Sequence, residues 1–267
     1  MNIKIVIATH KKYQMPKDDM YMPLHVGREV KNYIGYTGDN TGDNISSFNL
    51  RLCELTGMYW AWKNLQADYI GLVHYRRYFT LAGKMKRLFY RNKFQLIASK
   101  KDMEKILSQT DVIVPNKRKY YIETMESHFL HLPYTYEKDY RVFSDVIQEL
   151  SPEYMGSFKK VMNGTSAHMF NMFVMKRDLF NQYCKWLFPI ILEVDQRIDV
   201  TGYDRMQARA VAYYGEFMLD VWMNKNRISY KEVPVVFMEK QSMVKKAWSV
   251  LKRKFGINLI EKKKRNV

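Results

Sequence analysis

The chain has 267 residues, of which 47% are hydrophobic and 15% aromatic, and its formal net charge is +17. This length and composition allow a large hydrophobic core and exclude an intrinsically disordered chain. No apolar run has the length of a membrane-spanning helix, and the N-terminus lacks the apolar segment of a secretory signal peptide, so we expect a cytoplasmic protein. The cysteines, Cys53 and Cys184, are expected to be buried free thiols.

The first predicted element is a buried strand over residues 3–9, because this run is apolar and rich in β-branched side chains. Residues 11–45 are expected to form a long irregular connection. A helix follows from residue 46 or 47 to about residue 62, with its apolar side chains on one face. Later segments continue the alternation, with strands predicted over 69–74, 111–115, 168–175 and 233–237 and helices over 102–109, 177–198 and 205–224. Alternating strands and helices predict a mostly parallel α/β sheet flanked by helices.

The positive charge is concentrated in two segments. Residues 84–101 contain seven basic and no acidic side chains, and residues 240–267 contain ten basic side chains and one acid, so the rest of the chain is nearly neutral. Hydrophobic residues alternate with the basic ones in both segments. Such basic amphipathic segments bind anionic membrane surfaces. We therefore predict peripheral attachment to the inner face of the cell membrane, the alternative being solvated helices packed on the domain.

The most informative motif follows the strand predicted over residues 69–74. The strand ends in His74, and Arg76 and Arg77 come directly after it. Ligands of open α/β sheets bind outside the carboxyl ends of the strands, and the planar guanidinium group suits phosphate oxygens. We therefore predict that these side chains bind a diphosphate-bearing ligand. The alternative is an edge strand that continues into a solvated basic turn.

Two further segments are candidates for binding the same ligand. Thr9, His10 and Lys11 end the first strand, and the tandem repeat TGDNTGDN at residues 37–44 leads into a helix N-terminus, whose amide groups favour anions. The candidate side chains of the repeat are Asp39, Asn40, Asp43 and Asn44. Its aspartates have two alternative roles: they bind ribose hydroxyls or a cation, or they form two Asx turns that fix the loop.

The acid–base candidates lie in the second half of the chain. Glu216 is part of an aromatic-rich helix, where a partly buried carboxylate has a raised pKa and can act as a general base. Asp204 is the second candidate base, and His168 and Asn171 are candidates for contacting an acceptor. The alternatives are a surface position for Glu216 and a structural role for His168.

Several common motifs are absent from the sequence. There is no GxGxxG, no P-loop, no GxSxG and no cysteine or histidine pair with zinc spacing. These absences argue against a nucleotide-binding dehydrogenase, a P-loop enzyme and an α/β hydrolase.

The segments TGDNTGDNIS, CELTGMYWAWKN and DYIGLVHYRRYF, with looser blocks further on, resemble a bacterial family of capsular and exopolysaccharide glycosyltransferases. The resemblance implies a GT-A-like domain over residues 1–239, followed by the basic tail 240–267. It also implies a nucleotide-diphosphate sugar donor, UDP-galactofuranose being one candidate, and a lipid-linked (polyprenyl diphosphate) glycan acceptor.

The residues after the strand predicted over 69–74 differ from those of GT-A enzymes in one respect. Those enzymes commonly place an Asp-x-Asp metal site after the strand equivalent to 69–74, whereas this chain has His74-Tyr-Arg76. Since two arginines repel a divalent cation, we predict a transferase that needs no metal and no other cofactor, unless the aspartates of the repeat bind a metal.

Two other classes of protein compete with the enzyme. A pI near 9.6 with many aromatic residues is typical of nucleic-acid binding proteins. A non-catalytic membrane scaffold of polysaccharide assembly is the other alternative. The nearly neutral body and the lack of a nucleic-acid binding motif favour a glycosyltransferase without a nucleic-acid partner.

Overall fold

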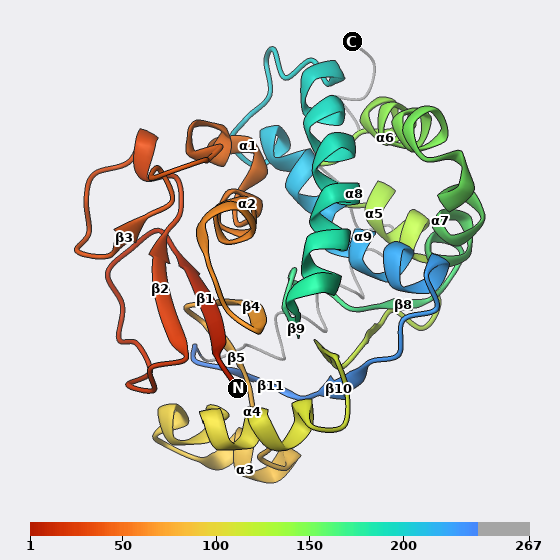
Figure 1. The fold of residues 1–267 in the computed structure, drawn as a ribbon. Coiled ribbons are helices and arrows are strands. Elements are labelled where there is room, and N and C mark those ends of the chain that lie inside the picture. The colour runs from red at the N-terminus through yellow and green to blue at the C-terminus, as the bar shows by residue number, and fades with distance from the viewer. Residues whose placement is uncertain (240–267) are drawn as a thin grey trace.

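The structure is a computed structural model that describes residues 1–239 (Figure 1). The predicted tail over residues 240–267, and its membrane contact, lie outside the described residues. The strands are β1 (Ile3–Thr9), β2 (Tyr21–His25), β3 (Thr37–Gly38), β4 (Tyr69–His74), β5 (Arg77–Phe79), β6 (Val112–Pro115), β7 (Arg118–Lys119), β8 (Ser166–Ala167), β9 (Phe173–Lys176), β10 (Lys231–Val233) and β11 (Val235–Phe237).

The central sheet has the strand order β10-β6-β9-β4-β1-β2-β3. Strands β3, β2, β1 and β4 pair in parallel, and so do β6 and β10. Only β9 within this order is reversed, because it pairs antiparallel with both β4 and β6. The mostly parallel α/β sheet is therefore confirmed. The short strands β5 and β11 pair with each other beside β4, and β7 and β8 form a separate ribbon.

Helices cover both faces of this sheet (Figure 1). They are α1 (Asn49–Leu52), α2 (Leu55–Asn64), α3 (Lys84–Phe89), α4 (Lys100–Leu107), α5 (Met125–Leu130), α6 (Glu137–Leu150), α7 (Met155–Met162), α8 (Arg177–Arg197) and α9 (Ala210–Lys225). Side chains alternate between two cores along β1, with Val6 in one and Ile5 and Ile7 in the other. The first core contains residues of α2 and α5–α9, and the second contains residues of α4 and β5.

Several predicted elements are confirmed with small changes in their bounds. β1, β4, β6 and α8 agree with prediction, and β4 is central rather than at an edge, so the edge-strand alternative for this segment is wrong. The strand predicted over 233–237 is two short strands on either side of Pro234. Each of these strands pairs with one neighbour, as expected because proline cannot donate to a ladder.

Three predictions of secondary structure are wrong. The connection 11–45 contains β2, which lies between β1 and β3. The helix predicted from residue 46 is broken at Cys53, whose φ of 49° interrupts the helical backbone between α1 and α2. The strand predicted over 168–175 begins only at Phe173, because Phe170 and Asn171 have φ values of 83° and 50°, which no strand accommodates.

Both cysteines are free thiols, as predicted, although only Cys184 is fully buried.

Candidate active site at the carboxyl edge of the sheet

The carboxyl ends of β1, β2 and β4 lie side by side, since Thr9 is paired in register with His25 and Ala8 with His74. This is the edge at which open α/β sheets bind their ligands. Thr9 is buried, and its hydroxyl donates to the Lys11 carbonyl at 2.7 Å, so it fixes the turn after β1. His25 is also buried, yet neither of its ring nitrogens has a hydrogen-bond partner within residues 1–239. Such unpaired buried groups are rare in folded proteins and mark this edge as unusual.

Basic side chains surround the turn after β1. Burial, followed by the positive charges of Lys31, Arg76, Lys11 and Arg209, lowers the pKa of His10 to about 4. These groups come from four separate segments of the chain. The edge is therefore electropositive and favours an anion there. We call His10, Lys11, Lys31, Arg76 and Arg209 the basic rim.

The two arginines after β4 have different surroundings. Arg76 is on the rim, where it forms an ion pair with Glu239 at 3.1 Å, and the same carboxylate lies 3.9 Å from Lys11. Arg77 is half-buried, with its guanidinium 4.3 Å from the centre of the Phe170 ring. Burial lowers the pKa of Arg77, while the nearby Glu216 carboxylate opposes that change. The predicted pair thus divides between the exposed rim, where Arg76 lies, and a half-buried position occupied by Arg77.

Glu216 lies on α9 at the inner end of this site. Its pKa is raised to about 7, mainly by burial and then by the neighbouring Glu54 carboxylate, while the Phe170 amide, Arg77 and Arg118 act in the opposite direction. A carboxylate with a pKa near 7 is well suited to accept a proton at neutral pH. The surface alternative for Glu216 is therefore wrong.

One short segment before β9 contacts three of the polar groups of the site. The backbone amide of Phe170 donates to Glu216 Oε2 at 3.3 Å, and its carbonyl oxygen lies 2.7 Å from His74 Nε2. The Asn171 side chain donates to Glu54 Oε1 at 2.8 Å. The left-handed backbone at Phe170 and Asn171 costs on the order of 1–3 kcal/mol per residue, and such strain is concentrated at functional sites.

His168 fixes the start of the segment that contains Phe170 and Asn171. It is buried, and the Asp220 carboxylate accepts its backbone amide at 2.8 Å and pairs with its Nδ1. Its Nε2 lies 3.3 Å from Glu232 Oε1. With both ring nitrogens engaged, His168 holds the segment in place, in agreement with the structural alternative for this residue. Asn171 is buried as well and contacts Glu54.

The polar side chains of the TGDN repeat mainly form hydrogen bonds with neighbouring parts of the chain. Asp39 is fully buried, and its carboxylate accepts the amides of Gly27 and Arg28 and the hydroxyls of Ser46 and Thr56. Asn40 donates to Glu29 at 3.2 Å. The first copy of the repeat thereby fixes the turn that leads to Lys31.

The second copy of the repeat lies further from the site. Asp43 accepts a hydrogen bond from Tyr59 at 3.1 Å and pairs with Lys63 at 3.4 Å, and Asn44 donates to the Gly42 carbonyl. Tyr59 and Lys63 are five and nine residues after Glu54, which corresponds to about 8 and 14 Å along α2. Within residues 1–239, no hydrogen bond or ion pair joins Asp43 or Asn44 to His74 or Arg76.

Asp204, the second candidate base, is exposed and accepts the backbone amides of Met206 at 2.7 Å and Gln207 at 2.9 Å. These bonds cap the short turn that precedes α9.

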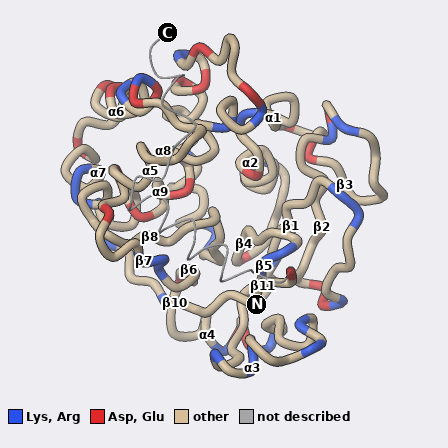
Figure 2. Tube along the Cα trace, turned by 180° about the vertical axis from the view of Figure 1, so that it is seen from behind, with Lys and Arg blue, Asp and Glu red and all other residues tan. Residues whose placement is uncertain are grey.

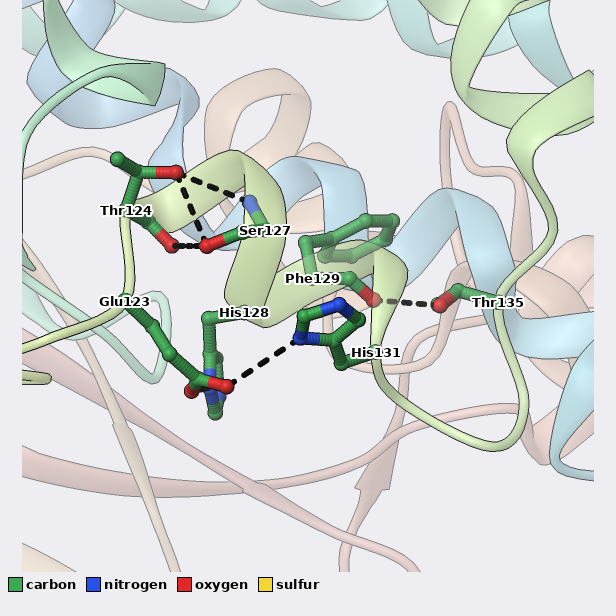
Figure 3. Close-up of polar contacts among 7 residues, drawn as sticks. All are labelled: Glu123, Thr124, Ser127, His128, Phe129, His131 and Thr135. Atoms are coloured by element: carbon green, nitrogen blue, oxygen red, sulfur yellow. Dashed lines mark hydrogen bonds and ion pairs between the residues drawn. The ribbon is translucent and has the colours of Figure 1, made fainter. Parts of the chain in front are cut away.

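Aromatic rings from the segment around α5 face the Glu216 side of the site. The Tyr120 ring lies 3.9 Å from the His128 ring, and burial raises the pKa of Tyr120 to about 12, with the Glu216 charge contributing. His128 and His131 both contact the Glu123 carboxylate, at 2.8 and 3.3 Å (Figure 3). Further along, Tyr134 and Tyr213 pack at 4.8 Å.

Sequence reasoning missed three groups of the site. Lys31 lies in a connection expected to be irregular, and Glu54 lies within a helix pattern, so neither has a local signal. His25 belongs to the unpredicted strand β2.

Within residues 1–239 no cluster of three or more His, Cys, Asp or Glu side chains is arranged to hold a metal ion.

The fold and this edge site define a class of protein. Among solved structures, the chain aligns with the WbbM bifunctional glycosyltransferase in its apo form with a TM-score of 0.81 and 28% identity, over 91% of this chain. The chain spans 46% of that chain's length. It therefore has a glycosyltransferase-like fold.

The family follows from the sequence comparison. Residues 4–227 match the profile described as Domain of unknown function (DUF4422), and the chain belongs to this family. No curated protein matches the chain.

Proposed function

We propose that the chain is a glycosyltransferase that moves a sugar from a nucleotide-diphosphate donor to a lipid-linked glycan in capsule or exopolysaccharide synthesis. The observation that carries the proposal is the placement of Glu216, with a pKa of about 7, beside Arg77. Glu216 and the rim residues Lys31 and Arg209 all act on the pKa of Cys53, so the carboxylate lies near the basic rim. A proton acceptor beside a cluster of cations suits a reaction that deprotonates a hydroxyl and releases a diphosphate. The similarity to a glycosyltransferase supports the same reaction.

The basic rim is the proposed site of the donor diphosphate, with uridine as the expected nucleoside. Cations positioned where negative charge develops stabilise a leaving diphosphate, which is the work that a metal ion does in other enzymes. We therefore propose metal-independent transfer. Asp39 is a positioning residue in this scheme, because it fixes the turn before Lys31.

In the proposed chemical step, Glu216 takes the proton of an acceptor hydroxyl as that oxygen attacks the anomeric carbon of the donor sugar. The bond from this carbon to the diphosphate breaks, and the diphosphate leaves with the electron pair, stabilised by Arg77 and Arg76. Burial and, after it, the Glu54 carboxylate keep the pKa of Glu216 high. The segment at Phe170 and Asn171 holds the two carboxylates in place through its hydrogen bonds to each.

The surface around α3 supports contact with an anionic membrane. This helix has no buried residue, and five large hydrophobic side chains near it are 40–70% exposed: Leu81, Met85, Leu88, Phe89 and Tyr90. Lysines and arginines lie between them (Figure 2). An exposed apolar patch with basic residues and no acid fits the interface of an anionic bilayer. No helix within residues 1–239 has the length and apolar character needed to cross a membrane.

The first experiment is a thermal-shift panel of nucleotide sugars with manganese or with EDTA, followed by a transfer assay with the donor that binds. We expect one UDP-sugar to raise the melting temperature equally in both conditions, because a ligand that binds only the folded state stabilises it. Glu216→Gln should keep this shift and lose transfer. A shift only with manganese would refute metal independence. If Glu216→Gln and Arg76→Ala both function as well as the natural chain, the non-catalytic scaffold is favoured.

A further inference from the structure

A hollow lies beside the β7–β8 ribbon, and none of the residues of the basic rim lines it. Its volume is about 810 Å³, and its walls are the end of α7, the ribbon and the C-terminal part of α9 with the residues that follow. Four basic side chains line it: Lys117, Lys160, Lys225 and Arg227. We call it the basic hollow.

Within residues 1–239, the positive charge of the basic hollow is only partly offset by acidic side chains. Within residues 1–239, none of its four cations forms an ion pair with a carboxylate. The single acidic residue of the lining is Asp220, and both of its oxygens are bonded to His168. Four cations and one carboxylate give the lining a formal charge of +3, which attracts an anion.

The remaining lining suits an anion attached to a sugar. Ser157, Ser166 and Asn224 supply neutral donors and acceptors, and Tyr230 supplies an aromatic ring. Lysine and arginine form charge-assisted hydrogen bonds with phosphate oxygens, whereas hydroxyl and amide groups match the hydroxyls of a glycan. The lining thus combines both kinds of recognition.

The basic hollow is connected to the active site by a single helix. Glu216 and Lys225 are nine residues apart on α9, which corresponds to about 14 Å along the helix axis. Consecutive residues of the chain also divide between the two sites, since Lys117 lines the hollow while the charge of Arg118 acts on Glu216. Asp220, which also lines the hollow, is four residues after Glu216 on the same side of α9, so the hollow begins about 6 Å along the helix axis from Glu216.

We propose that the basic hollow binds the diphosphate through which the glycan acceptor is joined to its lipid, while the acceptor hydroxyl lies at Glu216. This inference rests on the proposed function and adds a second anion site to it. A short glycan between the two sites spans the distance along α9. The hollow then selects acceptors by the distance between the diphosphate and the reacting sugar.

The test measures binding of inorganic pyrophosphate by calorimetry to the full chain and to three variants. The double variant Lys160→Ala/Lys225→Ala removes two cations of the hollow, and Lys159→Ala/Lys185→Ala removes two exposed helical lysines outside it. Arg76→Ala weakens the basic rim instead. We expect the first variant to lose about tenfold in affinity for one of two pyrophosphate sites, and the control to stay within twofold of the natural chain.

Two further probes separate the possible sources of the diphosphate. Farnesyl diphosphate carries it on a prenyl chain and UDP carries it on a nucleoside. Weaker farnesyl diphosphate binding in Lys160→Ala/Lys225→Ala, with unchanged UDP binding, supports the acceptor site. Weaker UDP binding alone overturns the acceptor assignment, and unchanged pyrophosphate binding overturns the site. If Lys160→Ala/Lys225→Ala loses pyrophosphate binding but the natural chain transfers no sugar from any donor, the proposed function is refuted and the anion site remains.

Discussion

Replacing Glu216 by glutamine should stabilise the protein at alkaline pH while it abolishes transfer. The pKa of this carboxyl is about 7 in the folded chain, against an ordinary value of 4.5. The folded state therefore binds more protons than the unfolded state between these values, so the unfolding free energy falls as the pH rises through this interval. The difference corresponds to about 3 kcal/mol, and partial solvent access to the side chain reduces the expected effect to about 1–2 kcal/mol.

The assay is urea denaturation of the natural chain and of Glu216→Gln at pH 4, 6 and 8.5. Glutamine keeps an oxygen that accepts the Phe170 amide, so the substitution removes the charge and retains the hydrogen bond. The variant should match the natural chain at pH 4, where the carboxyl is protonated in both states, and exceed its stability at pH 8.5. A constant difference at all three pH values would refute the raised pKa. A variant less stable at pH 8.5 would show that the charge contributes favourably to the fold.

Three other substitutions test separate parts of the structure. Glu54→Gln removes a charge that raises the pKa of Glu216, so the acidic limb of the pH–rate profile should move to lower pH by at most about one unit; movement to higher pH would contradict the coupling. Asp39→Ala leaves two amides and two hydroxyls without their buried acceptor and should cost about 3 kcal/mol in urea denaturation, whereas Asp43→Ala, at an exposed position, should cost less than about 1 kcal/mol. Leu88→Ser/Phe89→Ser should reduce sedimentation with anionic vesicles at least fivefold with no change in melting temperature, because both side chains are exposed; equal sedimentation would exclude α3 from membrane contact.

The sequence was sufficient for those parts of the fold that have a local pattern. β1, β4 and α8 are recognisable because their apolar runs have the length and periodicity of a strand or a helix. The group at His74, Arg76 and Arg77 was predicted on similar grounds, since a strand that ends in basic residues needs no knowledge of its neighbours. The raised pKa of Glu216 followed from its aromatic surroundings in the helix.

The parts that were missed depend on contacts between distant segments. β2 contains Pro23 and follows a polar stretch, and it is a strand because it lies between β1 and β3. The role of Glu54 arises from Asn171, which is 117 residues further along the chain. Asp39 looked like a ligand group, because no local pattern reveals that four donors of its own chain already occupy its carboxylate.

The reversed strand β9 determines which changes in chain length the site tolerates. Because β9 runs opposite to β4 and β6, the residues just before it reach the same edge as the residues just after the other strands. The excursion over 116–165 leaves this edge and returns to it, so loops within it are free to lengthen or shorten without moving Glu216 or His74. An insertion between His168 and Phe173 is different, because it would carry the Phe170 amide and carbonyl away from both groups. Diversity in acceptor recognition is therefore expected to accumulate in the excursion, while the five residues before β9 keep their number.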